Sequence, residues 1–206
     1  MENEIQAEVF KEQGNTAFKN GDWDQAINLY SKAINLSKED TRIISVYYKN
    51  RAAAYLKQEN YEAALQDCDK CLQIVPTDPK ALFRRCQALE ALKRYEEAYK
   101  DATQIFKDDP TNKPIQPVLE RLYKIVQERA KQNEKTSSKL ESMTKIAFDL
   151  KETTEKRETS MNNLLVLARQ HAGAELMVNS PILQEIKKLL KVITYIRYKS
   201  CLWMNT

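Results

Sequence analysis

The feature that most constrains this 206-residue chain is an internal repeat. Three segments align on an aromatic residue that is followed, three positions later, by an alanine: Trp23 and Ala26, Tyr61 and Ala64, Tyr95 and Ala98. The alanines are 38 and then 34 residues apart. A period in this range is the signature of stacked repeats, in which each unit buries its apolar face only against its neighbours. We therefore expect a repeat array.

Small residues recur where two antiparallel helices of one repeat would meet. With Ala7, Ser45 and Pro79 as first positions, position 8 holds Gly14, Ala52 and Cys86, position 20 holds Ala26, Ala64 and Ala98, and position 27 holds Ala33, Cys71 and Ile105. Pro76 and Pro110 stand at position 32, where proline ends a helix. The pattern predicts an all-α superhelix of three helix-turn-helix repeats, over about 7–40, 45–78 and 79–112. It resembles the tetratricopeptide repeat (TPR).

Apolar residues at helical spacing continue beyond the repeats. Pro117 can open a helix, and we expect a capping helix over 117–132, because repeat arrays need a terminal cover. The predicted TPR domain is therefore 1–132. Residues 133–139, NEKTSSK, are polar, and we interpret them as a linker or a frayed helix end. Residues 140–206 are expected to form further helices, with a tail from residue 191 that matches no pattern.

One stripe of the first helix in each repeat carries the candidate binding residues. Positions 2, 5, 6, 9 and 12 lie opposite the packing stripe and would line a concave groove. The residues on this stripe are Lys11, Asn15, Asn50, Lys80 and Arg84, with Phe18 and Ala53 beside them. Each of these polar residues taken singly fits a solvated surface, but five in phase favour binding of carboxylates, with Phe18 and Ala53 as an apolar shelf. Arg51 and Arg85 fall at position 7, toward the packing face, and we interpret them as structural arginines whose charges reach the surface.

This set of side chains resembles the dicarboxylate clamp of chaperone-binding TPR domains. Those domains hold the C-terminal Glu-Glu-Val-Asp of heat shock proteins 70 and 90. The resemblance implies that Lys11, Asn15 and Asn50 bind the terminal carboxylates. It also implies that Lys80 and Arg84 complete the clamp.

A second resemblance covers residues 1 to about 190. The stretch MNNLLVLARQHAGAELM follows the repeats and a spacer, and it is similar to the opening armadillo-like region of the animal UCS myosin chaperones, the uncoordinated class. The resemblance implies a cytoplasmic co-chaperone adaptor for heat shock protein 90, with heat shock protein 70 as an open alternative. In the full-length family this adaptor serves myosin folding and muscle assembly. Family members are several times longer, and residues 140–206 hold only a partial armadillo-like segment.

The composition argues against most catalytic sites. Three glycines leave no glycine-rich phosphate loop, and the single histidine, His171, excludes a His-ligated zinc site and argues against a histidine dyad. Cys68 and Cys71 form a C-x-x-C motif, but both fall at packing positions of their helix, so we interpret them as small core residues. We expect no cofactor, no bound metal and no enzymatic activity.

Charge and hydropathy argue against nucleic-acid and membrane partners. Residues 1–132 carry equal numbers of basic and acidic side chains, and the excess of the +4 net charge lies in 133–206. The chain opens without an apolar run, so we expect no signal peptide and reduced cytosolic thiols. Lys191, Arg197 and Lys199 interrupt the apolar tail, which is too short to span a bilayer.

Two other non-enzymatic interpretations stay open at this point. One is a TPR adaptor of another lineage that does not act on myosin, and the other is a scaffold that binds no chaperone. We also expect the C-terminal third to be the weakest part of the chain, because one and a half repeats cannot bury their own apolar faces. Leu183, Ile186, Leu190 and Ile193 would then be partly exposed.

Overall fold

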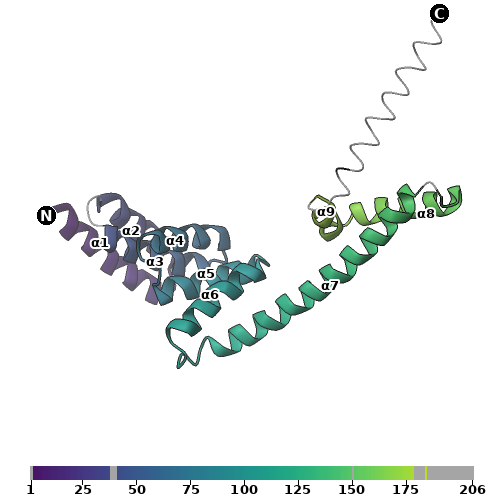
Figure 1. Ribbon diagram of the computed structural model, residues 1–206. Helices are drawn as coiled ribbons and strands as arrows, with labels where there is room; N and C mark the ends of the chain where they lie inside the picture. Colours follow the sequence, from purple (N-terminus) through teal and green to yellow (C-terminus); the bar gives the residue numbers. More distant parts are fainter. Residues whose placement is uncertain (1, 38–40, 150, 179–183, 185–206) are drawn as a thin grey trace, which may run out of the picture. The chain divides into compact units, whose positions relative to one another are not determined.

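The computed structural model describes residues 2–37, 41–149, 151–178 and 184, and all regular structure in them is α-helical. The helices are α1 (Glu2–Lys19), α2 (Trp23–Leu36), α3 (Thr41–Lys57), α4 (Tyr61–Ile74), α5 (Pro79–Ala91), α6 (Tyr95–Asp108), α7 (Gln116–Phe148), α8 (Thr154–Ala168) and α9 (His171–Val178) (Figure 1). The all-α fold is confirmed. The chain forms two compact units, Met1–Gln127 and Glu128–Thr206.

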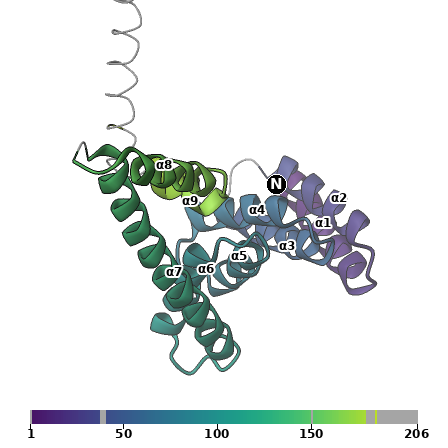
Figure 2. The same ribbon diagram turned by 90° about the vertical axis from the view of Figure 1, so that its right-hand side faces the viewer.

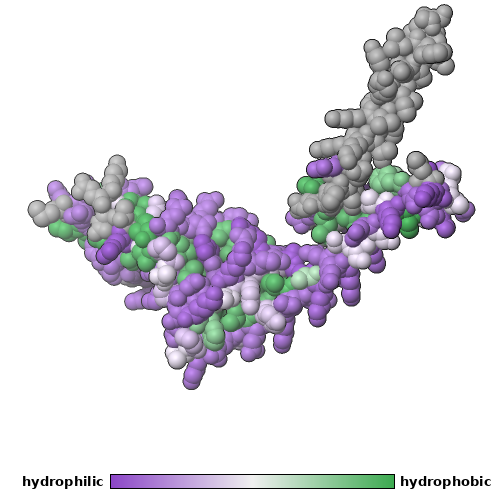
Figure 3. All heavy atoms as spheres, viewed as in Figure 1, coloured by the Kyte–Doolittle hydropathy of each residue, from purple (hydrophilic) through white to green (hydrophobic). Residues whose placement is uncertain are grey.

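Helices α1 to α6 of the first unit form three consecutive pairs. Each helix packs against the next one in sequence, and α3 also contacts both α1 and α5 (Figure 2). The first helices of the three repeats, α1, α3 and α5, therefore form one layer. The face of the molecule seen in Figure 3 is mostly hydrophilic, with small hydrophobic areas between the charged side chains.

The small residues lie where the repeat register predicts. Ala26, Ala64 and Ala98 at position 20 are completely buried, as are Ala33 and Cys71 at position 27. Within the repeats, space is tight at Gly14, where a Cβ atom would lie only 2.7 Å from Cε1 of Tyr30. Glycine is therefore needed at this place because the aromatic ring occupies the volume of a side chain.

The turns between paired helices repeat the same backbone geometry. Position 15 of each repeat has a positive φ: 82° at Gly21, 58° at Glu59 and 60° at Lys93. Glycine adopts this conformation freely, whereas the two longer residues are held in it by the packing on either side. The next residue caps the second helix in two repeats, because the side chains of Asp22 and Asn60 accept backbone N–H groups.

Arg51 and Arg85 are tied down by aspartates from the second helix of their own repeats. Arg51 donates two hydrogen bonds to Asp67, at 2.7 and 2.8 Å, and Arg85 does the same with Asp101. Both aspartates are buried, with exposed fractions of 2% and 5%. The arginines are thus structural, but they hold α3 to α4 and α5 to α6 through bidentate ion pairs rather than by extending to solvent.

Helix α7 corrects one expectation. It begins at Gln116 and runs without a break to Phe148, so residues 133–139 are part of a helix and not a linker or a frayed end. The segment contains neither proline nor glycine, and good helix-forming residues flank it on both sides. In the first unit, Ile115 and Leu122 are completely buried in the core of the third repeat.

The second unit has its own small core. Leu140, Ala147, Leu164 and Met177 are buried together, which places parts of the predicted apolar stripes inside. Leu165, Val166 and Val178 remain more than half exposed. Leu183, Ile186, Leu190 and Ile193, and the tail from residue 191, lie outside the described residues. Within the described part of the chain, no helix combines the length and the apolar character that crossing a membrane requires.

Replacing Ala64 by aspartate should unfold the repeat array. The side chain is completely buried between α3 and α4, and an unpaired charge there costs on the order of 3–5 kcal/mol. Gln66→Asp, on the exposed face of the same helix, is the matched control and should change stability by at most about 0.5 kcal/mol. Urea titration followed by circular dichroism measures both. Equal midpoints for the two variants would contradict the assigned packing face.

The three buried thiols should resist modification in the folded protein. Burial raises the pKa of Cys68 and of Cys86 to about 12, so very little reactive thiolate is present at pH 8. The fourth cysteine of the chain, Cys201, lies outside the described residues and is replaced by serine for this test. In that variant, Ellman's reagent should react with Cys68, Cys71 and Cys86 only after urea is added. Rapid reaction of the native protein would show that the C-x-x-C pair is an accessible thiol site instead of packing.

Candidate peptide-binding groove

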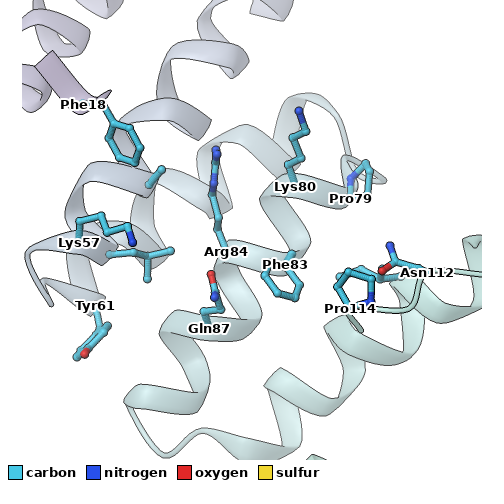
Figure 4. Close-up of a pocket in the computed structure, with 13 residues that line it drawn as sticks. Phe18, Lys57, Tyr61, Pro79, Lys80, Phe83, Arg84, Gln87, Asn112 and Pro114 are labelled. Atoms are coloured by element: carbon cyan, nitrogen blue, oxygen red, sulfur yellow. The ribbon is translucent and has the colours of Figure 1, made fainter. Parts of the chain in front are cut away.

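Two adjoining cavities line the layer formed by α1, α3 and α5. The smaller, of 220 Å³, is bordered by Asn15, Phe18, Lys19, Tyr30, Asn50, Ala53 and Arg84. The larger, of 800 Å³, is bordered by residues that include Leu56, Lys57, Lys80, Phe83, Gln87 and Asn112 (Figure 4). Phe18, Ala53 and Arg84 border both cavities. We call the two together the groove.

Three polar side chains meet in the smaller cavity. The hydroxyl of Tyr30 donates to Oδ1 of Asn15 at 2.8 Å, and Nδ2 of Asn50 donates to the same oxygen at 3.3 Å. These bonds join α1, α2 and α3. Both predicted amides are therefore brought together, with Phe18 and Ala53 beside them.

Arg84 and Lys80 differ in their surroundings, although both project from the same side of α5 (Figure 4). Lys80 is exposed. Arg84 is only partly exposed, and its Nη1 donates to the backbone oxygen of Lys49 at 2.5 Å. Burial lowers the pKa of Arg84 below its ordinary value, which is so high that the guanidinium stays charged at pH 7. Arg84 is therefore not a freely solvated side chain, whereas Lys80 is open to solvent.

Lys11 borders neither cavity. Its ammonium group pairs with Glu8 and, at 2.9 Å, with Glu12, and these hydrogen bonds raise the pKa of Lys11. Glu12 also accepts from Nδ2 of Asn15 at 3.3 Å, so one carboxylate touches both predicted clamp residues of α1. The hydrogen bonds from Lys11 and Asn15 hold the pKa of Glu12 below its usual value.

Asp78 fixes the start of α5 and thereby the position of Lys80 and Arg84 along the groove. Its side chain accepts the backbone N–H groups of Lys80 and Ala81 at 3.0 and 2.9 Å, and it pairs with Nζ of Lys49 at 2.5 Å. Burial by itself would raise the pKa of Asp78, but the Lys49 ammonium and the two N–H groups outweigh it and keep that pKa below its ordinary value.

Several groove residues were not predicted from the sequence. Phe83 and Gln87 occupy positions 5 and 9 of the third repeat, so the stripe rule was sufficient to find them. Lys19 and Lys57 share position 13 in the first two repeats, a regularity that was also visible. Asn112 comes from the connection after α6, where no helical periodicity applies.

The tetratricopeptide repeat family models match residues 7–40 and 45–78. The TPR domain of Arabidopsis OM64 superimposes with a TM-score of 0.55 at 39% identity, over 59% of this chain and 98% of that one. The chain belongs to the tetratricopeptide-repeat family. The first TPR of Spaghetti (RPAP3), solved with the HSP90 peptide SRMEEVD, is 31% identical with a TM-score of 0.55, over 60% of this chain and 97% of that one.

Unc-45 proteins are among the relatives whose similarity extends beyond the TPR unit. Protein unc-45 homolog B of Danio rerio is 43% identical over 166 residues, which cover 80% of this chain and 18% of that protein. The myosin chaperone UNC-45 of C. elegans, solved with a Hsp90 peptide, has a TM-score of 0.60 at 39% identity, over 84% of this chain and 20% of that one. It was also solved with a Hsp70 peptide. The resemblance to the animal UCS proteins is confirmed, and the chain spans about a fifth of their length.

Two substitutions at Asp78 should separate its two roles. Asp78→Asn keeps a good helix cap but loses the charge that faces Lys49, whereas Asp78→Ala loses both. We expect Asp78→Ala to lose about 1–2 kcal/mol of unfolding free energy and Asp78→Asn clearly less.

The effect of pH follows from the direction of the pKa shift. Since the folded pKa of Asp78 lies below its ordinary value of 3.8, its contribution is present above that value and is lost as pH falls through the folded pKa. Urea titrations of the wild type and of Asp78→Ala at pH 7 and pH 3 measure this contribution. The difference in unfolding free energy between the two proteins should be smaller at pH 3 than at pH 7. If Asp78→Ala were as stable as the wild type at pH 7, Asp78 would not anchor α5.

Proposed function

We propose that the TPR unit is a co-chaperone docking module that binds the acidic C-terminal tail of heat shock protein 90. The observation that carries this proposal is the gathering of Asn15, Asn50 and Arg84 in one small cavity beside Phe18 and Ala53. Amide N–H groups and a guanidinium are donors for carboxylates, and the two apolar side chains lie where a neighbouring aliphatic side chain would rest.

Each clamp residue has a role that fits its surroundings. Asn15 and Asn50 donate to the terminal carboxylates, and Arg84, already fixed by the Lys49 carbonyl, supplies charge without moving. Lys80 is exposed at the rim of the larger cavity and reaches an acidic side chain further up the peptide. Lys11 joins the clamp when the peptide carboxylate replaces Glu8 and Glu12.

The larger cavity accommodates the residues that precede the acidic end of the peptide. Leu56, Phe83 and Ile105 provide an apolar floor, with Lys57 and Gln87 among the polar residues around it. A peptide such as SRMEEVD carries methionine before its two glutamates, and methionine fills irregular apolar space. The peptides bound by Spaghetti and by C. elegans UNC-45 support heat shock protein 90 as the partner, with heat shock protein 70 as the second.

We also propose the wider role that the relatives indicate. Residues 1–132 form the chaperone-binding domain, and the helical segment after residue 132 corresponds to the start of the armadillo-like region. The protein acts in the cytoplasm as a non-enzymatic adaptor. In the longer family members, the client that is brought to the chaperone is myosin. The name of the C. elegans relative as a myosin chaperone supports the choice of client.

The first test is a titration with SRMEEVD in two forms, as the free acid and as the C-terminal amide. A groove that reads the terminal carboxylate should bind the free acid at least about tenfold more tightly, since charge-assisted hydrogen bonds are lost in the amide. Isothermal titration calorimetry or fluorescence anisotropy measures both affinities. Equal binding of the two forms would rule out a carboxylate clamp.

Charge reversal at Lys80 should weaken binding without unfolding the repeats. Lys80→Glu places a repelling charge at the rim of the groove, and we expect a loss of about tenfold or more in affinity for the free acid. Lys124→Glu, on an exposed position of α7 outside both cavities, is the matched control and should bind as the wild type does. A thermal midpoint lowered by Lys80→Glu but not by Lys124→Glu would contradict the assignment of Lys80 to the ligand.

A further inference from the structure

The smaller cavity contains a buried hydroxyl that the clamp does not explain. Tyr30 projects from α2, the second helix of the first repeat, and its exposed fraction is 2%. Its hydroxyl nevertheless reaches the cavity and donates to Oδ1 of Asn15 at 2.8 Å. Burial raises the pKa of Tyr30 to about 12, so the hydroxyl keeps its proton at any physiological pH.

Gly14 is the reason that this hydroxyl reaches Asn15. Three atoms of the Tyr30 ring lie 2.7, 2.9 and 3.2 Å from the place where a Cβ of residue 14 would stand. The ring therefore packs directly on the backbone of α1, one residue before Asn15. The second and third repeats hold Cys68 and Ala102 at the position of Tyr30, and neither side chain is a hydroxyl donor.

Three groups define which way the Asn15 amide points. An asparagine amide can take two orientations that exchange its acceptor oxygen and its donor nitrogen. Tyr30 and Asn50 donate to Oδ1, and the carboxylate of Glu12 accepts from Nδ2. In the reverse orientation the oxygen of Asn15 would face the Glu12 carboxylate, which has no proton to donate. The Tyr30 hydroxyl would then have to accept instead of donate, and the Asn50 amide would have to turn as well. Nδ2 is thus turned away from Tyr30.

Of these three groups, Tyr30 is the one that a bound ligand leaves in place. The Glu12 side chain is 63% exposed, and a peptide carboxylate that takes Lys11 would compete with it for Nδ2 of Asn15. Asn50 would itself turn to the ligand. The ring of Tyr30 is enclosed in a core that includes Ala17, Ala26 and Leu29 of the first repeat and Ala54 of α3.

We propose that Tyr30 is the positioning residue of the clamp, which holds Oδ1 of Asn15 so that Nδ2 faces the terminal carboxylate of the peptide. This inference rests on the proposed function. The other clamp residues lie on α1, α3 and α5, the first helices of the three repeats, whereas Tyr30 lies on α2, the second helix of the first repeat. In this proposal Tyr30 acts on the peptide through Asn15.

The test is a double-mutant cycle in the full chain with the free-acid peptide SRMEEVD. Tyr30→Phe keeps the ring against Gly14 and removes only the hydroxyl, and it should weaken binding about three- to tenfold. In the Asn15→Ala background the same substitution should have no further effect, because the group it orients is absent. Tyr99→Phe on α6, whose ring faces Tyr123 outside the groove, is the control and should bind as the wild type does.

Two outcomes of the cycle would overturn the proposal. If Tyr30→Phe weakens binding equally with and without Asn15, the hydroxyl supports the fold rather than the amide. If it changes nothing in either background, the hydroxyl has no role in binding.

The affinity for the amidated peptide is measured in parallel. Tyr30→Phe should change that affinity less than twofold.

A second measurement needs no peptide and separates this inference from the proposed function. In ¹H–¹⁵N spectra of the free protein, the side-chain amide signals of Asn15 should shift in Tyr30→Phe and stay in place in Tyr99→Phe. Unchanged signals in Tyr30→Phe would overturn the inference even where the wild type binds peptide. If the signals shift but free acid and amide bind equally, the orienting contact stands and the proposed function fails.

Discussion

The close approach of the two helices within each repeat is the constraint on which the rest of the structure depends. Alanine at position 20 is completely buried in all three repeats, at Ala26, Ala64 and Ala98. A larger side chain there would separate the helices, and each pair is packed on the next, so the displacement would be passed along the array. The spacing of α1, α3 and α5 follows from this packing, and that spacing sets the width of the groove.

The same packing pairs several acidic side chains with basic ones inside a unit that is nearly neutral overall. Asp67 and Asp101 are buried against arginines between the helices of one repeat. Asp78 caps α5 and pairs with Lys49. These acidic groups are neutralised locally, so they do not oppose the cationic side chains at the groove. A unit whose basic and acidic residues balance can therefore still present a face that attracts an acidic peptide.

The sequence was sufficient for the repeat register and for most of the groove. Glycine or alanine at fixed positions, and proline at the ends, identify the helix pairs because helical periodicity is a local property. Asn15 and Asn50 were predicted from that register, and the structure brings them together. The break at 133–139 was a wrong prediction, because a polar segment without proline or glycine continues a helix as readily as it ends one.

By itself the sequence determined the helical repeats, the packing face of each helix and the stripe that carries the cationic and amide side chains. Only the tertiary structure decided which of those side chains meet. Lys11 pairs locally with carboxylates of its own helix. Arg84 and Asn15, by contrast, are held from other helices, by a carbonyl of α3 and by a hydroxyl from α2. These contacts depend on the tilt and height of neighbouring helices and on the space that Gly14 leaves for a ring. Such quantities arise from the packing of whole helices, which a one-dimensional period does not contain.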